Sequence, residues 1–402
     1  MTRELRVDPA ALAGGTVYGT EQLRHQLALR APRMGCQFNA EDIVVTQGEG
    51  ESLQLRLRLL AAFFVVSAVL STNVCAQVKV QGAGASFPSK VYQRWAETYA
   101  STNKVTVEYK ATGSGDGIKQ ATERKVVFGG TDSPLKPEEL AQRKLVQLPT
   151  AVGGVVPVVN LRGVGSNQLV LTGELLADLF AGKVARWNDP RIAALNPGVA
   201  LPATSVQRVV RADKSGTTEG FSKYLALMNP SFKNEVGASQ LPKWPGQPIT
   251  GDGNDGVVKA LTTTDGGLTY VSYDRVLRDK LTAVRLRNAA GKDVAASEAG
   301  FSAAIRESDL HKNGDDLASI LNQAGDTSWP ITLTTFVLFD AAPAKAETVD
   351  AALRFFYWAF MNGDRLIKGT GFAPLPTPVQ AKLSTRFAQV KPQDGVALKY
   401  YI

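Results

Sequence analysis

Histidine and cysteine are scarce in this sequence. The 402 residues contain two histidines, His25 and His311, and two cysteines, Cys36 and Cys75. A Cys/His zinc site needs several such ligands, and a Ser-His-Asp triad needs a histidine beside its nucleophile. The counts therefore argue against metal chemistry and nucleophilic catalysis, and they predict a protein without a metal and without catalytic residues.

Long apolar runs are also missing. The run LLAAFFVVSAVL at residues 59–70 has twelve residues, whereas spanning a bilayer takes about 20. Two arginines precede the run, and the small-residue pattern of a signal-peptidase site ends at Ala76. We therefore interpret residues 53–76 as a secretory signal peptide and expect a periplasmic protein that begins at Gln77. A buried core helix is the alternative for this run.

Runs of basic residues are absent too, although the formal net charge is +8. Residues 1–76 contain seven arginines and seven acidic residues, so the whole excess lies after position 76. Such a surface suits nucleic acid, an anionic membrane or a small anionic ligand. Because the basic residues are scattered singly and are not interleaved with aromatic residues, nucleic acid is the least favoured of these partners.

A signal peptide that starts near residue 53 leaves 52 residues in front of it. Within them, TVYGTEQLRHQLALRAPRMGCQFNAEDIVVTQGEG resembles the start of the aminotransferase-like domain of pyridoxal-phosphate enzymes and related transcription regulators. The segment that would supply the Schiff-base lysine is missing, so the resemblance implies no pyridoxal cofactor. We expect residues 1–52 to be a non-functional fragment that results from a gene fusion or a misassigned start codon. A small folded module is the alternative, but so short a segment buries little surface.

From Gln77 onward, short β-branched runs alternate with helical patterns, which predicts an α/β fold. Four predicted strands end in turns rich in glycine and small polar residues: VKVQGAG, KVTVEYKATGSG, VVFGGTDSPL and VVRADKSG. In an α/β sheet such turns lie at the carboxyl ends of strands, where ligands bind, and the helix N-termini that follow offer free N–H groups to an anion. Each turn alone is more simply explained as an ordinary turn or helix cap. Their order along the chain is more informative.

In this order the turns resemble the PstS family, the phosphate-binding proteins of phosphate-specific ABC transporters. The resemblance covers about residues 78–372. It implies that phosphate is bound by the Ser86 hydroxyl and the Phe87 N–H in GAGASFP, by Ser114 in TGSGDGIKQ, by Asp132 in FGGTDSP, and by Arg211, Ser215, Gly216 and Thr217 in RADKSGTT. Asp213 is implied as a support for Arg211. One departure is Asp116, whose carboxylate would repel a nearby anion unless it turned outward or found a partner.

The same resemblance implies a two-lobed periplasmic binding protein with the ligand between the lobes. Extended β-branched segments at about 155–160 and 329–336 would be the hinge strands, which gives lobe one residues 77–156 and 332–402 and lobe two residues 157–331. A bound anion would bridge the lobes and favour closure. The implied ligand is inorganic phosphate, the implied partner is the membrane permease of an ABC transporter, and we expect a monomer.

Three alternatives have different sequence requirements. A periplasmic phosphatase would need a nucleophile beside a base, or a metal cluster, but His311 lies in the polar run ESDLHKNGDD, which is typical of a solvated loop. A binding protein for another oxyanion would use the same turns. A regulator with a pyridoxal-like module would need more of that domain than residues 1–52 contain.

Overall fold

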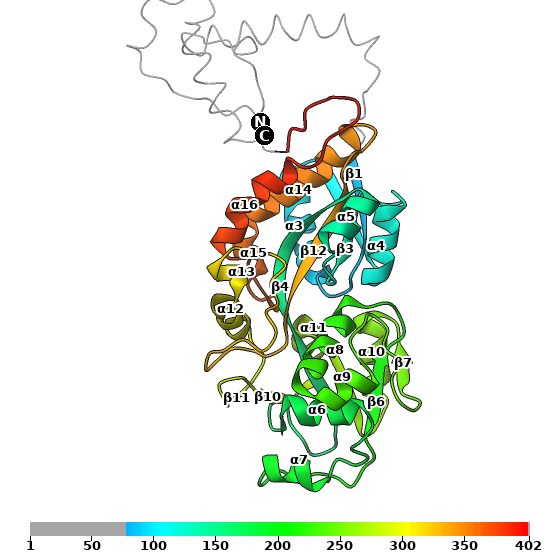
Figure 1. Cartoon of the computed structure of the whole chain (residues 1–402), viewed down its shortest axis with the longest axis vertical. Helices are drawn as coiled ribbons and strands as arrows, with labels where there is room; N and C mark the ends of the chain where they lie inside the picture. Colours follow the sequence, from blue (N-terminus) through cyan, green and yellow to red (C-terminus); the bar gives the residue numbers. More distant parts are fainter. Residues whose placement is uncertain (1–77, 401–402) are drawn as a thin grey trace, which may run out of the picture. The chain divides into compact units, whose positions relative to one another are not determined.

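Strand β4 (Leu145–Asn160) runs through both halves of this protein (Figure 1). The computed structural model describes residues 78–400. The first part of β4 pairs antiparallel with β12 (Thr332–Asp340), and the second part pairs antiparallel with β8 (Gly267–Ser272). All residues of β4 except the last are buried, which explains why its sequence is a continuous apolar and β-branched run rather than an alternating one.

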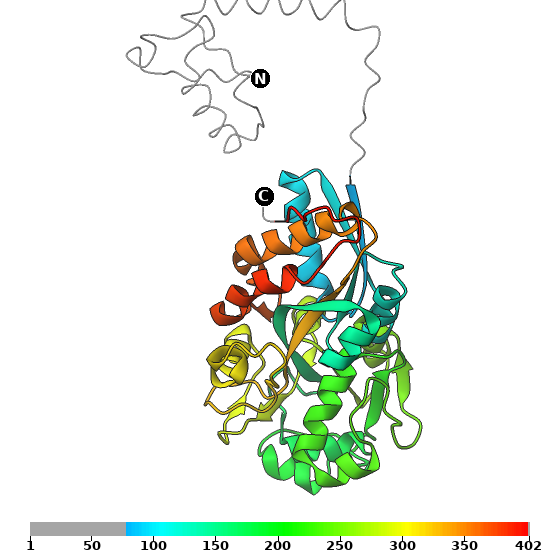
Figure 2. The same cartoon turned by 45° about the horizontal axis from the view of Figure 1, so that its top comes forward.

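The first half is a sheet in the order β2-β1-β3-β12-β4. The first three strands are parallel and are joined through helices, as βαβ units require. Its elements are β1 (Val78–Gly84), α3 (Ser89–Thr102), β2 (Val105–Ala111), α4 (Ser114–Thr122), β3 (Phe128–Thr131), α5 (Pro137–Arg143), α14 (Glu347–Asn362), α15 (Asp364–Ile367), β13 (Phe372–Ala373) and α16 (Thr377–Phe387). Helices α14 and α16 lie side by side in both views (Figures 1 and 2) and pack through Phe387, whose ring is 6.1 Å from that of Tyr357.

The second half continues the sheet in the order β4-β8-β6-β7, in which β6 is parallel to both neighbours. Its elements are α6 (Gly173–Phe180), α7 (Pro190–Leu195), β6 (Gln207–Arg211), α8 (Gly216–Met228), α9 (Pro230–Glu235), β7 (Ile249–Gly251), α10 (Gly253–Thr262), α11 (Tyr273–Asp279) and β9 (Thr282–Ala283). A separate small sheet contains β5 (Val170–Leu171), β10 (Arg285–Arg287) and β11 (Asp293–Val294). The architecture confirms the α/β fold class predicted from the sequence.

The tryptophan side chains at the centres of the packed layers are buried together with their hydrogen-bonding groups. Trp95, Trp187 and Trp329 are 0–2% exposed. Their indole N–H groups donate to backbone carbonyls, for instance from Trp329 to the carbonyl of Val155 at 2.9 Å. Since an unpaired buried donor is costly, these bonds let three large side chains enter the core without that penalty. The apolar face of α3 is buried as well, at Val91, Trp95 and Tyr99.

Helices α12 (Glu298–Glu307) and α13 (Asp309–Lys312) pack beside elements of the first half. The Glu298 carboxylate accepts hydrogen bonds from the N–H groups of Gly369 and Gly371, both at 2.9 Å. Just after α13, Asp316 forms an ion pair with Arg386 of α16. The lobe limits implied by the resemblance put these helices in lobe two, within residues 157–331, whereas these contacts favour the first half. The lobe limits stay a prediction.

Residues 1–77 lie outside the described part of the chain, and with them the predicted signal peptide and the segment at residues 1–52. Among the helices within residues 78–400, none is both long and apolar enough to cross a membrane.

Candidate functional site

The turns that end β1, β2 and β3 contact the turns that end β6 and β7. The N–H of Gly115 donates to the carbonyl of Lys214 at 2.9 Å, and the hydroxyl of Thr217 donates to Asp132 at 3.3 Å. These bonds bring loops of the first half against loops of the second half. The turns that the sequence analysis singled out are therefore neighbours in space.

Asp132 is a buried carboxylate that follows β3 and is surrounded by hydroxyl groups. It is 6% exposed. Its Oδ1 accepts a hydrogen bond from Thr335 at 2.8 Å, and its Oδ2 accepts the one from Thr217. Its backbone N–H donates to the Ser114 hydroxyl at 3.1 Å. Burial raises the pKa of Asp132 to about 7, although the hydrogen bond from Thr335 and the charge of Arg211 oppose this rise.

Arg211, at the end of β6, is a buried cation held by a neighbouring carboxylate. Its side chain is 1% exposed. Nε donates to Asp213 Oδ1 at 2.7 Å, and Nη2 donates to Oδ2 at 2.5 Å. Within the described residues, the remaining nitrogen, Nη1, has no hydrogen-bond partner. A planar fork fixed on one side in this way presents its other donors in a set direction.

Asp213 is itself fixed by the start of α10, in the same half of the protein. Its Oδ1 also accepts the N–H of Gly253, which begins α10, at 2.9 Å. Burial raises the pKa of Asp213, but the hydrogen bond and charge of Arg211 more than offset burial, so the pKa lies below its usual value. The carboxylate is therefore ionised at neutral pH and keeps the guanidinium in place.

Helix α8 begins with the capping residue Ser215, followed by Gly216 and Thr217. Ser215 caps the helix, because its Oγ accepts the N–H of Thr218 at 3.1 Å. The N–H groups of the first helical turn have no partner inside the helix and suit an anion. A Cβ at Gly216 would stand 2.6 Å from Ser114 Oγ and 2.7 Å from Asp132 Cβ. Only glycine therefore allows the two halves to approach this closely here.

Ser86 and Phe87 lie in the turn between β1 and α3. Phe87 is fully buried, and its ring packs edge-on against Phe372 with centroids 4.9 Å apart. Ser86 is 9% exposed, and its Oγ accepts a hydrogen bond from Asn254 Nδ2 at 3.1 Å. This bond again connects the first half with the second.

Two residues at this place were not singled out from the sequence. Asn254 and Thr335 lie in the segments GNDGV and WPITLTTF, which belong to the resemblance but were given no role there. Both side chains act across long sequence separations, on Ser86 and on Asp132. The local signal for Asn254 was the glycine-rich polar segment GDGNDG, which begins at the end of the short strand β7. Asp116, by contrast, has a partner on its own helix, because its carboxylate accepts a hydrogen bond from Gln120.

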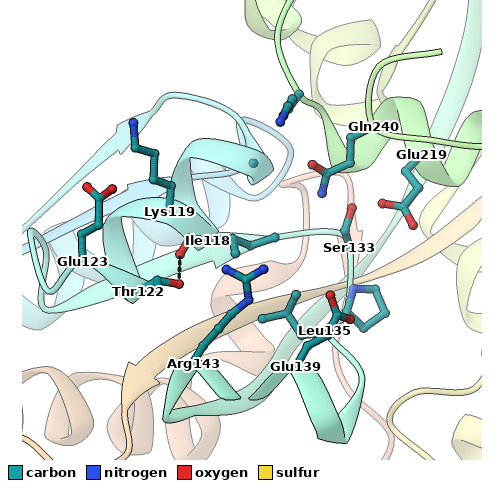
Figure 3. Close-up of a pocket in the computed structure, with 13 residues that line it drawn as sticks. Ile118, Lys119, Thr122, Glu123, Ser133, Leu135, Glu139, Arg143, Glu219 and Gln240 are labelled. Carbon is teal, nitrogen blue, oxygen red and sulfur yellow. Dashed lines mark hydrogen bonds between the residues drawn. The ribbon is translucent and has the colours of Figure 1, made fainter. Parts of the chain in front are cut away.

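An open pocket of about 510 Å³ lies beside these groups (Figure 3). Its lining includes Gly115, Ser133 and Lys214, each next in sequence to a predicted site residue. Figure 3 shows Arg143 reaching from the end of α5 towards Ile118. None of the predicted site residues lines this pocket. The predicted site residues are therefore neighbours of the residues that line the pocket and do not line it themselves.

The chemistry that this arrangement can perform is recognition. Hydroxyl and N–H donors surround one buried guanidinium and one carboxyl group whose pKa is near neutrality. In the part of the chain that the structure describes, no three potential metal ligands are grouped together. The arrangement suits an oxyanion that carries a proton, since the donors satisfy its oxygens and Asp132 can accept its hydrogen.

Comparison with known proteins agrees with this chemistry. Residues 69–362 match the PBP superfamily domain. The phosphate-binding protein PstS of Pasteurella multocida (strain Pm70) is 39% identical over 345 residues, which cover 85% of this chain and 98% of that protein. The protein of the same name from Xylella fastidiosa (strain 9a5c) is 39% identical over 311 residues, which cover 77% of this chain and 85% of that protein.

Solved structures show the same fold. The periplasmic phosphate-binding protein PfluDING, determined with bound phosphate, matches with a TM-score of 0.61 at 23% identity and covers 77% of this chain and 93% of its own. A phosphate-binding protein from Stenotrophomonas maltophilia matches with a TM-score of 0.59 at 22% identity and covers 77% of this chain and 94% of its own. The family match begins at residue 69, so it lends no support to the aminotransferase resemblance of residues 1–52.

Proposed function

The chain belongs to the PBP superfamily and, within it, to the PstS phosphate-binding proteins, and we propose that it holds inorganic phosphate between its two halves. Family membership makes it a binding protein of a phosphate ABC transporter and not an enzyme. The proposed contacts are the Ser86 hydroxyl, the Phe87 N–H, Ser114, Asp132, Arg211, Ser215, Gly216 and Thr217, with Asp213 as the support of Arg211.

The observation that carries this assignment is the free edge of Arg211. Nη1 is buried and has no acceptor among the described residues, while Asp213 fixes the opposite edge of the same guanidinium. A buried donor without an acceptor costs about 1–3 kcal/mol, more when it is charged, and an oxyanion removes that cost. Arginine forks match phosphate geometry particularly well.

Asp132 supplies the discrimination between phosphate and a fully ionised anion. Phosphate near neutral pH carries at least one proton, which an ionised Asp132 accepts. Sulfate has no proton to give, so the carboxylate repels it. Because the pKa of Asp132 is about 7 in the free protein, the carboxyl group is partly ionised at neutral pH and can adjust its protonation to the ligand.

The site and the family also support a place for the protein in transport. We propose that it is exported by residues 53–76, begins at Gln77 as a mature monomer in the periplasm, and delivers phosphate to a membrane permease. The relatives' shared name and the periplasmic, phosphate-bound protein of the same fold support the phosphate-binding role in the periplasm. Mass spectrometry of the exported form tests the mature N-terminus.

Calorimetric titration with phosphate, arsenate and sulfate tests the proposed ligand. We expect tight binding of phosphate, weaker or similar binding of the isosteric arsenate, and no measurable heat with sulfate. If sulfate binds as tightly as phosphate, the ligand assignment is wrong, because the role of Asp132 then fails.

A further inference from the structure

Asn254 joins the two halves and lies in the segment GNDGV, to which the sequence gives no role. The residue stands at the start of α10 and is 2% exposed. Its Nδ2 donates to Ser86 Oγ at 3.1 Å, and its backbone N–H lies 3.4 Å from the same oxygen. The two residues are 168 positions apart. This contact exists only while the turn after β1 faces α10.

The orientation of the Asn254 amide is fixed from its other side. Its Oδ1 accepts the N–H of Ser272 at 3.4 Å. Ser272 is the last residue of β8 and stands opposite Val155 in the middle of β4. Since Oδ1 is held by a backbone N–H, the group that faces Ser86 is the donor Nδ2.

Two donors on one hydroxyl oxygen decide where the hydrogen of that hydroxyl points. A serine hydroxyl has two lone pairs and one hydrogen. The two N–H groups of Asn254 occupy the lone pairs of Ser86 Oγ, so Ser86 can offer only its hydrogen to a third group. Among the residues that the structure describes, no acceptor takes that hydrogen. An anion between the two halves is the acceptor that completes the arrangement.

We propose that Asn254 is a positioning residue for phosphate: it holds the Ser86 hydroxyl in the orientation in which it donates, and it ties the two halves together in the closed arrangement. This inference rests on the proposed function, because it requires that Ser86 donate to bound phosphate. Asn254 therefore acts through Ser86, and its effect on binding depends on the presence of that hydroxyl.

A double-mutant cycle on the full chain tests this dependence. Asn254→Ala should weaken phosphate binding about tenfold, which corresponds to about one hydrogen bond. Most of the loss should appear as faster dissociation, because the closed arrangement is the one that loses a contact. In a Ser86→Ala background, the same substitution should change the Kd less than twofold, because the hydroxyl that it positions is gone.

Asn254→Asp separates positioning from packing. The aspartate side chain has the same shape, but an ionised carboxylate only accepts hydrogen bonds and would take the Ser86 hydrogen for itself. We expect this variant to bind phosphate more weakly than Asn254→Ala. A packing role would make the isosteric variant the milder one.

Asn196→Ala is the matched control. Asn196 is another buried asparagine, 4% exposed, which donates to the carbonyls of Val170 and Ile192 and accepts the N–H of Val170. This control should lower the Tm and leave the phosphate Kd unchanged. Native-like affinity in Asn254→Ala, or an equal loss in the Ser86→Ala background, would overturn the inference and leave the proposed function standing. A native chain that does not bind phosphate would overturn both.

Discussion

Replacing Asp132 with asparagine should change how the stability of the ligand-free protein depends on pH. Burial raises the pKa of this carboxyl group from 3.8 to about 7 in the folded state. A group with a raised pKa favours folding while it is protonated. That contribution is complete below the unfolded pKa and is lost as pH rises through the folded pKa. The native protein therefore loses stability between about pH 4 and pH 7, while Asp132→Asn has no such group to ionise.

The magnitude follows from the shift. Each pKa unit corresponds to about 1.4 kcal/mol, so a shift of about three units is worth about 4 kcal/mol in total. At pH 5 roughly a third of that is already lost, which leaves a change of about 3 kcal/mol between pH 5 and pH 8. Asp274 also has a pKa raised by burial to about 7, but it is present in both proteins, so its contribution cancels in the comparison.

Urea unfolding in phosphate-free buffer at pH 5 and pH 8 measures this effect. The free energy of unfolding of the native protein should fall relative to that of Asp132→Asn by about 3 kcal/mol over this interval. The control is Asp116→Asn, since Asp116 is paired with Gln120 on its own helix. If the native and Asp132→Asn values change in parallel with pH, the buried carboxyl group is not the source of the dependence, and the reasoning about Asp132 is refuted.

Three further predictions concern binding. Arg211→Ala should weaken phosphate binding about 100-fold or more, because two charge-assisted hydrogen bonds are lost. Lysine at this position should rescue binding only partly. Unchanged affinity in a titration would mean that the site is misplaced. Competition titrations should show that the native protein prefers phosphate over sulfate by about 10⁴-fold or more. Asp132→Asn should prefer phosphate much less. Equal discrimination by the two proteins would exclude Asp132 as the selectivity element. Gly216→Ala should impair closure of the two halves, because the added Cβ would overlap Ser114. Small-angle scattering of this variant with saturating phosphate should find a more open form than that of the native protein. A native-like scattering profile would contradict this prediction.

The sequence predicts those parts of the fold that depend on local pattern. The buried face of α3 follows from apolar residues at helical spacing, and the crossing of the chain near residue 155 follows from the β-branched run of β4. The packing of α12 and α13 beside elements of the first half does not follow from any periodicity. It depends on contacts such as that of Glu298 with Gly369, which join segments far apart in the chain.

The candidate site shows the same division between local and distant information. Ser114, Asp132 and Thr217 stand in turns whose composition already suggests a ligand, and the structure brings them into hydrogen-bonding contact. Asn254 also lies in a glycine-rich segment, GDGNDG, but its composition does not show which polar residue acts, and Thr335 lies inside strand β12. Their importance lies entirely in their partners, which are 168 and 203 residues away. Polar residues of this kind become visible only when the fold places a donor beside an acceptor.

The electrostatics of the site point to directed dipoles as the main source of affinity. Arg211 is the buried cation among the proposed contacts, and Asp213 already neutralises it through two short hydrogen bonds. Asp132 adds negative charge whenever it is ionised. The net charge of these three groups is therefore zero or negative, and Coulomb attraction by formal charge contributes little to holding an anion.

The stabilisation must come from N–H and O–H groups aimed at the ligand in a dry environment, where each hydrogen bond is stronger than in water. Because those groups are contributed by both halves, closure assembles them, and residues that set their direction, such as Asn254, matter as much as residues that bear charge.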